Sequence, residues 1–495
     1  MHYQSTRDCT LRYEAAEAIQ LGLSREGGLL TPCEIPQMDQ GFLQELVSAT
    51  YQERAARVMG LYLTDYSTEE LHQFAENAYC CEKFDTNAVA PVRVLNENTS
   101  CLELWHGPTS AFKDMALQML PQLLSAALRK NGEEKTACIL TATSGDTGKA
   151  AMEGFADVPQ TCILVFYPKN GVSAIQEAQM LTQEGQNVSV CAVAGNFDDA
   201  QSGVKQIFSD EMIRAELAER GYFLSSANSI NWGRILPQVV YYISAYCDLI
   251  KNGSISLGDQ VNFCVPTGNF GDILAAYYAK RMGLPVGKLI CASNRNHILT
   301  DFFRTGIYDR NRPFHTTTSP SMDILVSSNL ERLLFDLSGK NDAEIRMYME
   351  SLAKEGRYQV SEKILTALQE QYWGGFCDET GTADTIAKYN RHYQYLMDPH
   401  TAVAANVLEQ YRAATGDQTQ TVIVSTASPY KFCDSVLDAI GQVPKGHGID
   451  LLEQLHDATG TAVPRHLAAL KGKHCRFGDA CEKADMKHVV MEFLR

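Results

Sequence analysis

The sequence predicts an α/β protein whose parallel sheets are covered by helices, and two observations support that prediction. From about residue 92 onward, short runs rich in β-branched residues alternate with longer stretches of helical periodicity. This alternation indicates βαβ units, in which a helix joins neighbouring parallel strands and packs on the sheet. The 495 residues are 45% apolar and 21% charged, with only 35 Gly and 16 Pro, which excludes a collagen-like or disordered chain.

The expected elements divide the chain into four parts. Residues 1–92 are expected to form an N-terminal extension of turns and amphipathic helices, including 11–21 and 42–63. Residues 93–296 hold the first part of the α/β core, residues 297–400 a largely helical insertion, and residues 401–495 a return to the larger α/β domain. The expected strands are 102–104, 137–143, 162–167, 188–193, 261–265, 289–292 and 421–426, and the helices between them include 149–155, 174–182, 198–208 and 273–282.

Charge and cysteine usage restrict the class of partner and the compartment. The net charge of −16 disfavours binding to nucleic acid or to an anionic membrane. Residues 1–11 lack the apolar core of a signal peptide, and no run of about 18 apolar residues follows. The fifteen cysteines contain no CxxC pair, which is typical of free thiols in a reducing compartment. We therefore expect a cytoplasmic protein.

Two glycine-rich turns stand where a strand ends and a helix begins. They are residues 143–148 (Thr-Ser-Gly-Asp-Thr-Gly) and 266–272 (Pro-Thr-Gly-Asn-Phe-Gly-Asp). Backbone N–H groups at such a junction face the positive end of the helix dipole and favour an anion. Neither turn is a Walker A or a GxGxxG sequence, and each taken alone is equally well an ordinary tight loop with Asp146 or Asp272 as a cap.

Lys113 lies in an unusual place for a lysine. The sequence around it runs from an expected strand into an apolar helix, with Thr109 or Ser110 as the expected N-cap, so Lys113 falls in the first helical turn. The dipole and burial against Phe112 would both lower the pKa of the amine, as a lysine that forms a Schiff base requires. The alternative is an ordinary solvated lysine. Pro121 is expected to kink or restart the helix.

Together these features suit an aldehyde cofactor that carries a phosphate. Such a cofactor needs a lysine for its carbonyl carbon, an N–H cradle for its phosphate and a partner for its ring nitrogen. The hydroxyls of Ser425 and Thr426, at the end of the last expected strand, would supply that partner.

With these residues, the chain resembles the threonine synthase family, in its longer microbial type, within the pyridoxal-phosphate enzymes of fold type II. The resemblance covers nearly the whole chain and follows the family in order through residues 5–7, 22–29, 106–109, 112–114, 143–148, 167–169, 176–180, 195–201, 228–232 and 268–272. It implies two parallel-type sheets covered by helices, as in the tryptophan synthase β fold, with an N-terminal helical extension and a helical insertion.

The resemblance also implies an activity. Family members are carbon–oxygen lyases acting on phosphate (EC 4.2.3.1) that convert O-phospho-L-homoserine and water into L-threonine and phosphate, the last step of threonine biosynthesis. Two alternatives stay open: a phospho-lyase of the same fold that releases 2-oxobutyrate, and a non-catalytic relative. A monomer or a homodimer is expected.

The family's functional residues carry over onto matching positions. By resemblance, Lys113 would form the Schiff base with pyridoxal 5'-phosphate and move protons. The cofactor phosphate would be held by Gly268, Asn269, Phe270, Gly271 and Asp272, and the ring nitrogen by Thr426. Ser144, Gly145, Asp146 and Thr147 would lie over the substrate carboxylate, while Asn228, Ser229, Asn231, Arg234 and Lys431 are candidates for the substrate phosphate. For Arg234 and Lys431 a surface ion pair is the alternative.

Two departures and one further cluster complete the sequence predictions. Many fold type II relatives have Asn at the position of Asp146, whose carboxylate would repel a phenolate unless it is protonated or bridged by water. Ser428 replaces the family's usual His. The cluster of His466, His474, Cys475, Cys481 and His488 matches no zinc signature, so scattered surface residues and no metal are expected.

Overall fold

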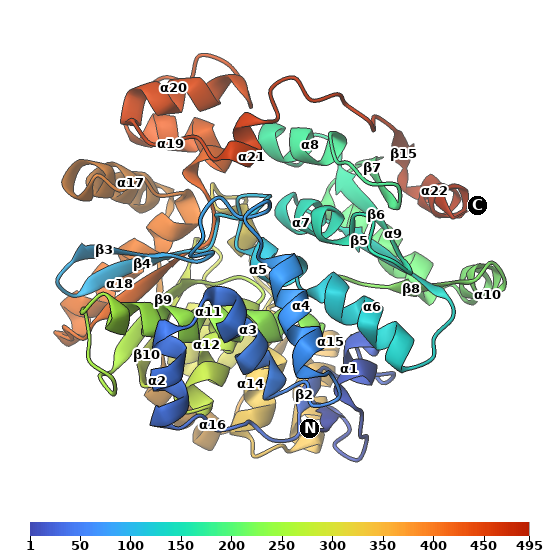
Figure 1. Ribbon diagram of the computed structural model, residues 1–495, viewed down its shortest axis with the longest axis horizontal. Coiled ribbons are helices and arrows are strands. Elements are labelled where there is room, and N and C mark those ends of the chain that lie inside the picture. The colour runs from blue at the N-terminus through green and yellow to red at the C-terminus, as the bar shows by residue number, and fades with distance from the viewer. Residues whose placement is uncertain (495) are drawn as a thin grey trace.

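The computed structural model describes residues 1–494 and contains two main sheets, each with helices packed against it (Figure 1). The larger sheet has the order β13 (Tyr372–Phe376), β10 (Val286–Ser293), β9 (Val261–Pro266), β14 (Thr421–Ser425), β4 (Thr99–Glu103) and β3 (Val92–Asn96). All its pairings are parallel except β3 with β4. The smaller sheet, β15 (Ala480–Glu482), β7 (Val188–Ala194), β6 (Thr161–Pro168), β5 (Thr136–Ala142) and β8 (Tyr222–Ser225), is parallel throughout. The predicted fold class is confirmed.

The core helices follow the predicted alternation. They are α5 (Lys113–Leu117), α6 (Leu120–Lys130), α7 (Asp146–Phe155), α8 (Ala174–Leu181), α9 (Phe197–Ser209), α10 (Glu211–Glu219), α11 (Trp232–Lys251) and α12 (Gly271–Arg281). The chain does restart at Pro121, because α5 ends at Leu117 and Pro121 stands in the first turn of α6. Almost every residue of α11 is buried, and it packs against α12, α5 and the extension, so it forms the centre of the larger domain.

The N-terminal extension is more broken than predicted. It contains the hairpin of β1 (Tyr3–Ser5) and β2 (Leu30–Pro32) and the helices α1 (Ala15–Leu21), α2 (Gln40–Ser48), α3 (Tyr51–Gly60) and α4 (Thr68–Ala78). The single helix expected over 42–63 is wrong, because Thr50 and Glu53 form a capping box that starts a new helix at Tyr51. The apolar periodicity continues from α2 into α3, so the pattern alone did not show that one helix ends and another begins.

The stretch 297–400 is largely helical and also completes the larger sheet. It contains α13 (Ile298–Thr305), β11 (Ile307–Asp309), η1 (Pro320–Met322), α14 (Leu330–Leu337), α15 (Asp342–Glu355), β12 (Arg357–Gln359), α16 (Glu362–Gln371), β13 and α17 (Glu379–Tyr393). β13 pairs in parallel with β10 at the sheet edge. The stretch is thus joined to the core rather than set apart from it.

The last part of the chain serves both sheets. After α18 (Pro399–Thr415) and β14 in the larger domain come η2 (Pro429–Phe432), α19 (Cys433–Ala439), α20 (Asp450–Thr459), α21 (Arg465–Ala468), β15, η3 (Lys483–Asp485) and α22 (Met486–Phe493). β15 pairs with β7, so the chain ends on the smaller sheet and not, as expected, in the larger domain (Figure 1). The expected domain boundaries otherwise stay a prediction.

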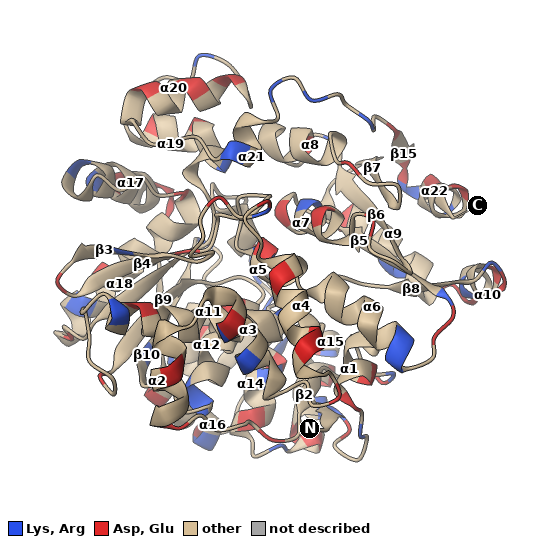
Figure 2. Cartoon of the chain, in the orientation of Figure 1, with Lys and Arg blue, Asp and Glu red and all other residues tan. Residues whose placement is uncertain are grey.

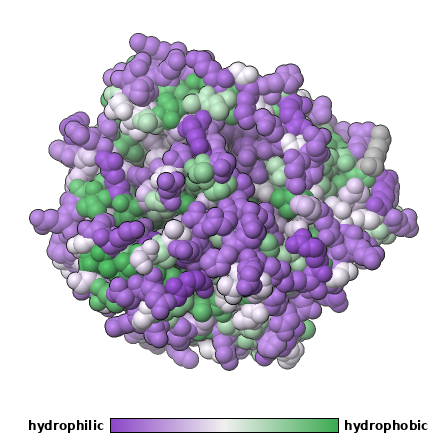
Figure 3. All heavy atoms as spheres, in the orientation of Figure 1, coloured by the Kyte–Doolittle hydropathy of each residue, from purple (hydrophilic) through white to green (hydrophobic). Residues whose placement is uncertain are grey.

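The outer helices carry interspersed acidic and basic residues (Figure 2), and the same face is mostly hydrophilic with small apolar areas between (Figure 3). None of the helices in residues 1–494 is long and apolar enough to cross a membrane. Within the same range, no group of three or more His, Cys, Asp or Glu side chains could hold a metal ion. All fifteen cysteines are free thiols.

A buried carboxylate fastens the extension to the larger domain. Arg7 donates from Nε and Nη2 to the two carboxylate oxygens of Glu331 at 2.9 and 2.8 Å, and Thr6 Oγ1 donates to the same group at 2.6 Å. The side chain of Glu331 is only 5% exposed, so its charge depends on these partners.

We predict that Arg7→Ala lowers the free energy of unfolding by about 2 kcal/mol, because it leaves the buried charge of Glu331 uncompensated. Chemical denaturation monitored by circular dichroism measures the change. Arg25→Ala, at an exposed position of the same extension, is the matched control and should change stability by less than about 0.5 kcal/mol. Equal effects of the two substitutions would contradict the prediction.

Candidate active site

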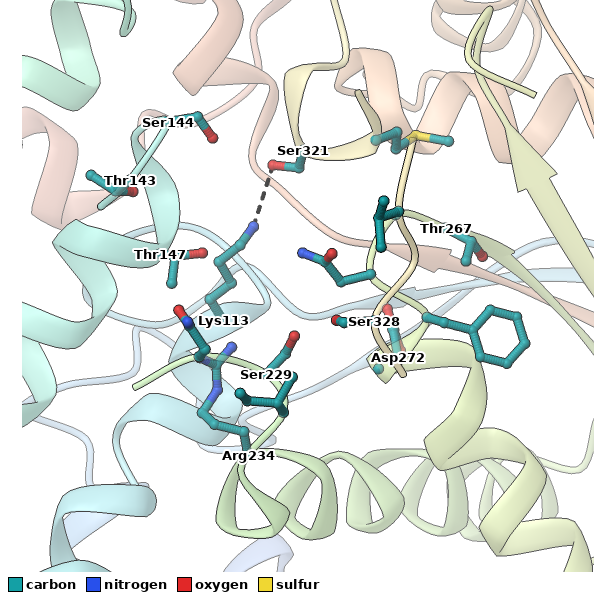
Figure 4. A pocket seen from close by; sticks show the side chains of 18 of the residues that line it. Lys113, Thr143, Ser144, Thr147, Ser229, Arg234, Thr267, Asp272, Ser321 and Ser328 are labelled. Atoms are coloured by element: carbon teal, nitrogen blue, oxygen red, sulfur yellow. Dashed lines mark hydrogen bonds between the residues drawn. The ribbon is translucent and has the colours of Figure 1, made fainter. Parts of the chain in front are cut away.

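A cavity of about 630 Å³ lies between the carboxyl ends of β5 and β9, where the two glycine-rich turns meet. Its walls come from both sheets: the turn before α7 on one side, and the turn before α12 on the other. Figure 4 shows Lys113 extending into this space, with Ser144 and Thr147 on one side, Thr267 and Asp272 on the other, and Arg234 beside Ser229. Ligands of open α/β sheets collect at such strand ends.

The structure brings most of the predicted site residues together. Those that line the cavity are Lys113, Ser144, Thr147, Asn228, Ser229, Arg234, Gly268, Asn269, Phe270, Gly271, Asp272 and Thr426. Gly145, Asp146, Asn231 and Lys431 are not lining residues. Gly145 N donates to Thr143 Oγ1 at 3.0 Å, and the partners of the other three are described below.

Lys113 is buried at the start of α5, and its amine is held by polar groups. Its Nζ donates to Ser321 Oγ at 3.3 Å and lies 3.6 Å from a carboxylate oxygen of Asp146. Burial lowers the pKa of the amine, and the nearby Lys431 and Arg234 add to that effect against the opposing attraction of Asp146. The amine is thus displaced toward the neutral form that a nucleophile or base needs.

The expected cap of this helix is wrong. α5 has only five residues and begins at Lys113 itself, after Phe112 in helical conformation and without a side-chain cap. Thr109 instead donates through its backbone N and its Oγ1 to the carboxylate of Asp114, at 2.8 and 2.7 Å. Burial, and not a capped helix terminus, is the main cause of the lowered lysine pKa.

Asp146 is an ionised carboxylate between two lysines. Lys431 Nζ approaches it at 2.6 Å, and Gln176 Nε2 donates to it at 2.9 Å. Although burial opposes ionisation, Lys431 and Lys113 hold the pKa of Asp146 far below its usual range. Its surroundings therefore favour the ionised form of Asp146 over protonation, one of the two conditions named from the sequence.

Lys431 is neither a surface residue nor a wall of the cavity. Its side chain is fully buried and bonded to Asp146 and to the Thr109 carbonyl, the latter at 2.9 Å. Asn231 also has a structural position, because its Oδ1 accepts from Gly233 N at the start of α11 and its Nδ2 donates to the Ile19 carbonyl at 2.9 Å. The contacts of Asn231 join α11 to the extension, and both side chains are engaged away from the cavity wall.

The turn before α12 has the shape of an anion cradle. Phe270 stands in the left-handed region at φ 65°, which turns the backbone of residues 268–271 around the end of the strand. Asp272 is held by two tyrosines of α11, since Tyr241 and Tyr242 donate to its Oδ1 at 2.5 and 2.6 Å. Burial, opposed by those two bonds, raises the pKa of Asp272 to about 6. Its side chain thus anchors the turn.

Arg234 brings a buried positive charge to the same cavity. It is 3% exposed and donates to the Ala227 carbonyl, and no acidic partner lies within salt-bridge distance among residues 1–494. Its Nε has no partner in the described part of the chain, and burial lowers the pKa of the guanidinium to about 10. An uncompensated buried guanidinium at a cavity favours an anionic ligand.

Several residues that line the cavity were not predicted from the sequence. Phe197, Gln201 and Lys205 line the cavity from one face of α9, a face that their spacing of four residues could have indicated. Arg310, Ser321, Met322, Val326 and Ser328 come from the stretch expected to be an insertion, and His400 from the start of α18. Nothing in the local pattern placed these last residues near Lys113.

Ser425 and Thr426 have different partners, although both end β14. Thr426 lines the cavity, and its carbonyl accepts from Phe112 N at 2.8 Å. Ser425 Oγ accepts from Trp105 Nε1 at 3.0 Å and is thereby engaged on the other side of the strand. Of the two hydroxyls, only that of Thr426 is available to a ligand.

Comparison with known proteins agrees with this geometry. Family models described as Threonine synthase N terminus, Pyridoxal-phosphate dependent enzyme, and Threonine synthase, C-terminal match residues 2–79, 95–427 and 401–490. Threonine synthase of Pseudomonas aeruginosa is 39% identical over 482 residues, which cover 95% of this chain and 97% of that protein. The chain belongs to the threonine synthase family. The resemblance seen in the sequence motifs is confirmed.

Other members of the threonine synthase family extend the comparison. Threonine synthase-like 1 of Homo sapiens is 41% identical over 450 residues, covering 88% of this chain, and the chain spans 59% of the length of that relative. Solved structures of the family include a PLP-bound threonine synthase from Brucella melitensis, with a TM-score of 0.89, 36% identity and complete coverage of both chains. The yeast threonine synthase has a TM-score of 0.89 and 34% identity, covering 100% of this chain and 98% of its own.

His106 supports the strand end beside this site through two carboxylates. Its Nδ1 lies 2.6 Å from Asp85 and its Nε2 2.8 Å from Glu103, and the indole of Trp105 stacks on its ring. Burial alone would lower the pKa of His106, but the bonds to Asp85 and Glu103 raise it to about 9.

We predict that the His106 contribution to stability is complete below pH 6.5 and is lost as the pH rises to about 9, because the folded state binds the proton more tightly than the unfolded state does. The free energy of unfolding should fall by up to about 3 kcal/mol more in wild type than in His106→Gln over this window. Denaturation at pH 6, 7, 8 and 9 tests this, and parallel pH profiles of the two proteins would contradict it.

Proposed function

We propose that this chain is a pyridoxal-phosphate-dependent threonine synthase, which converts O-phospho-L-homoserine and water into L-threonine and phosphate. The observation that carries the proposal is a buried amine of lowered pKa, Lys113, that shares one cavity with an anion cradle and with the unpaired guanidinium of Arg234. The family relatives named threonine synthase, at 37–39% identity, support the same activity.

The cavity fits the cofactor. Lys113 would hold its carbonyl carbon, the backbone of Gly268 to Gly271 its phosphate, and Thr426 its ring nitrogen. The hydroxyl partner is uncharged and leaves a pyridine nitrogen largely unprotonated. Pyridoxal phosphate, when bound, supplies an electron sink that acidifies the Cα–H of an amino acid substrate.

Lys113 is the group in the cavity that can move protons. Its neutral amine would take the proton from Cα, release it, and then take one from Cβ as phosphate leaves Cγ. Protons would return to Cγ and Cα, while water adds its hydroxyl at Cβ and gives its remaining proton to the phosphate. Asp146 stays ionised and can hold the protonated amine between the two transfers, because it lies 3.6 Å away. Lys431 neutralises Asp146 and keeps it in place.

The substrate ends would be bound on different walls. The hydroxyls of Ser144 and Thr147 suit the α-carboxylate, and Asn228, Ser229 and Arg234 suit the phosphate ester. Lys205 and Arg310 lie at the same cavity, on α9 and just after β11, and add positive charge to a chain whose net charge is −16. Local cations of this kind attract a dianionic substrate that the overall charge would repel.

The proposal extends to location and assembly. The fifteen free cysteines support a reducing compartment, and we place the enzyme in the cytoplasm. A monomer or a homodimer stays the prediction for its oligomeric state. The substrate is a small molecule, and no nucleic acid or membrane partner is proposed.

We predict that Lys113→Ala abolishes the visible absorption of bound cofactor and the adduct trapped by borohydride, because the amine that bonds the carbonyl carbon is gone. Absorption spectra and intact-protein mass measure both effects. Lys251→Ala, at the exposed end of α11, is the control and should leave them unchanged. An unchanged spectrum of Lys113→Ala would refute the assignment.

The product decides between threonine synthase and the related lyase. Incubation of the purified protein and cofactor with O-phospho-L-homoserine should yield L-threonine and one equivalent of phosphate. Accumulation of 2-oxobutyrate would instead identify a phospho-lyase, and a protein that fails to bind the cofactor would be a non-catalytic relative.

We predict that Lys205→Gln and Arg310→Gln each lower kcat/KM about three- to tenfold at low ionic strength, because they remove charge that attracts the phosphate ester. The salt dependence of kcat/KM should become shallower, while kcat falls less. Arg25→Gln is the control at an exposed position. A salt profile as steep as that of wild type would contradict the role.

A further inference from the structure

The turn formed by η1 lies at the centre of the site. Ser321 Oγ accepts the hydrogen bond from Lys113 Nζ (Figure 4). The same Oγ lies 3.5 Å from a carboxylate oxygen of Asp146. The Ser321 carbonyl packs on the cradle, since a Cβ added to Gly268 would lie 2.4 Å from that oxygen. One residue thus touches the reactive amine, its carboxylate partner and the phosphate cradle.

His400 holds this turn by a single bond. Its Nε2 accepts from the Ser321 backbone N at 3.2 Å, and its side chain lines the cavity although the residue is only 2% exposed. The residues on either side of the turn, Ser319 and Asp323, are held by Asn294, whereas in the described part of the chain the Ser321 backbone N is bonded to His400. The His400 bond therefore acts directly on the residue that carries the hydroxyl.

Asp398 fixes which nitrogen of His400 is free. His400 Nδ1 donates to Asp398 at 2.6 Å, and Asp398 also accepts from the backbone N of His400 and of Thr401, at 2.9 and 3.1 Å. Because the hydrogen is used at Nδ1, the lone pair at Nε2 is left for Ser321. The arrangement is that of a ring oriented by a carboxylate, with its acceptor aimed at one N–H.

A merely structural role would need only the shape of the ring. The His400 ring packs against Phe432 with centroids 5.1 Å apart, a contact that Phe at position 400 would also make. Phenylalanine has no acceptor for Ser321, whereas glutamine can present its amide oxygen near the position of Nε2. The two substitutions therefore separate packing from the hydrogen bond.

We propose that His400 is a positioning residue for Lys113: by accepting the Ser321 N–H it fixes the turn whose hydroxyl receives the lysine amine. This rests on the proposed function only where it concerns the rate of the reaction. Loss of the acceptor frees the turn, and the amine then loses the partner that holds it between Asp146 and the cofactor cradle.

The first test uses the full chain before pyridoxal phosphate is added. Limited acetylation followed by mass spectrometry gives the labelling rate of Lys113 relative to the exposed Lys251. We expect His400→Phe to raise that ratio about five- to tenfold and His400→Gln to restore it to within about twofold of wild type. His456→Phe, on α20, is the matched control and should leave it unchanged.

The second test uses the loaded enzyme. We expect kcat of His400→Phe to fall about tenfold with KM within about twofold, a larger isotope effect with substrate deuterated at Cα, and recovery in His400→Gln. Ser321→Ala keeps the backbone N–H but lacks the hydroxyl, so it should show the same rise in Lys113 labelling as His400→Phe. It replaces His400→Phe in the labelling test if that variant does not fold.

Equal behaviour of the Phe and Gln variants in the labelling test overturns the proposal, and so does an unchanged labelling ratio in Ser321→Ala. If wild type forms no threonine, the proposed function fails, but the labelling ratios still decide the role of His400.

Discussion

The site depends on a carboxylate shared by two buried lysines. Asp146 begins α7 on the side of the smaller sheet and contacts both Lys431, on η2 after β14 of the larger sheet, and Lys113, on α5. The buried carboxylate depends on the positive charge of the lysines, while burial displaces the amine of Lys113 toward its neutral form. The contacts of Asp146 also join the two halves of the molecule.

This constraint explains the uneven distribution of polar groups around the cavity. On the side of Asp146, the carboxylate is paired with Lys431 and Lys113. On the side of Arg234, a guanidinium is buried without an acid, which is unfavourable in the protein alone and becomes favourable when an anion arrives. The buried guanidinium therefore lowers the stability of the protein without ligand, at the position where a ligand binds. Such local destabilisation is common at functional sites.

Local patterns predicted the regular elements well and the long-range contacts poorly. The alternation of strands and helices could be predicted, because packing against a sheet imposes a different hydrophobic periodicity on each. The two glycine-rich turns could be placed at strand ends, because the residues before them were predicted to form strands. The site residues Lys113, Gly268 and Thr426 followed from chemistry combined with resemblance. The capping box at Thr50 was overlooked, because the apolar period continued on both sides of it.

The rest could not be found in the sequence, for physical reasons. Ser321 meets Lys113 across 208 positions of the chain and His400 across 79, and no local periodicity encodes such contacts. Lys431 was predicted to be a phosphate ligand, because the sequence shows that the residue is a lysine but does not show that its side chain is buried. The strand β15 is three residues long and follows a polar stretch, so only its partner β7 identifies it as a strand.

That last strand has a consequence for how the protein is made. Strands β5 to β8 emerge from the ribosome within residues 136–225, but their edge at β7 is completed only by residues 480–482. For the translation of some 250 further residues the nascent smaller sheet presents an open edge, the kind of template on which neighbouring chains aggregate. In the folded protein β15 covers this edge, so the protection of the smaller sheet at β7 depends on the C-terminal segment.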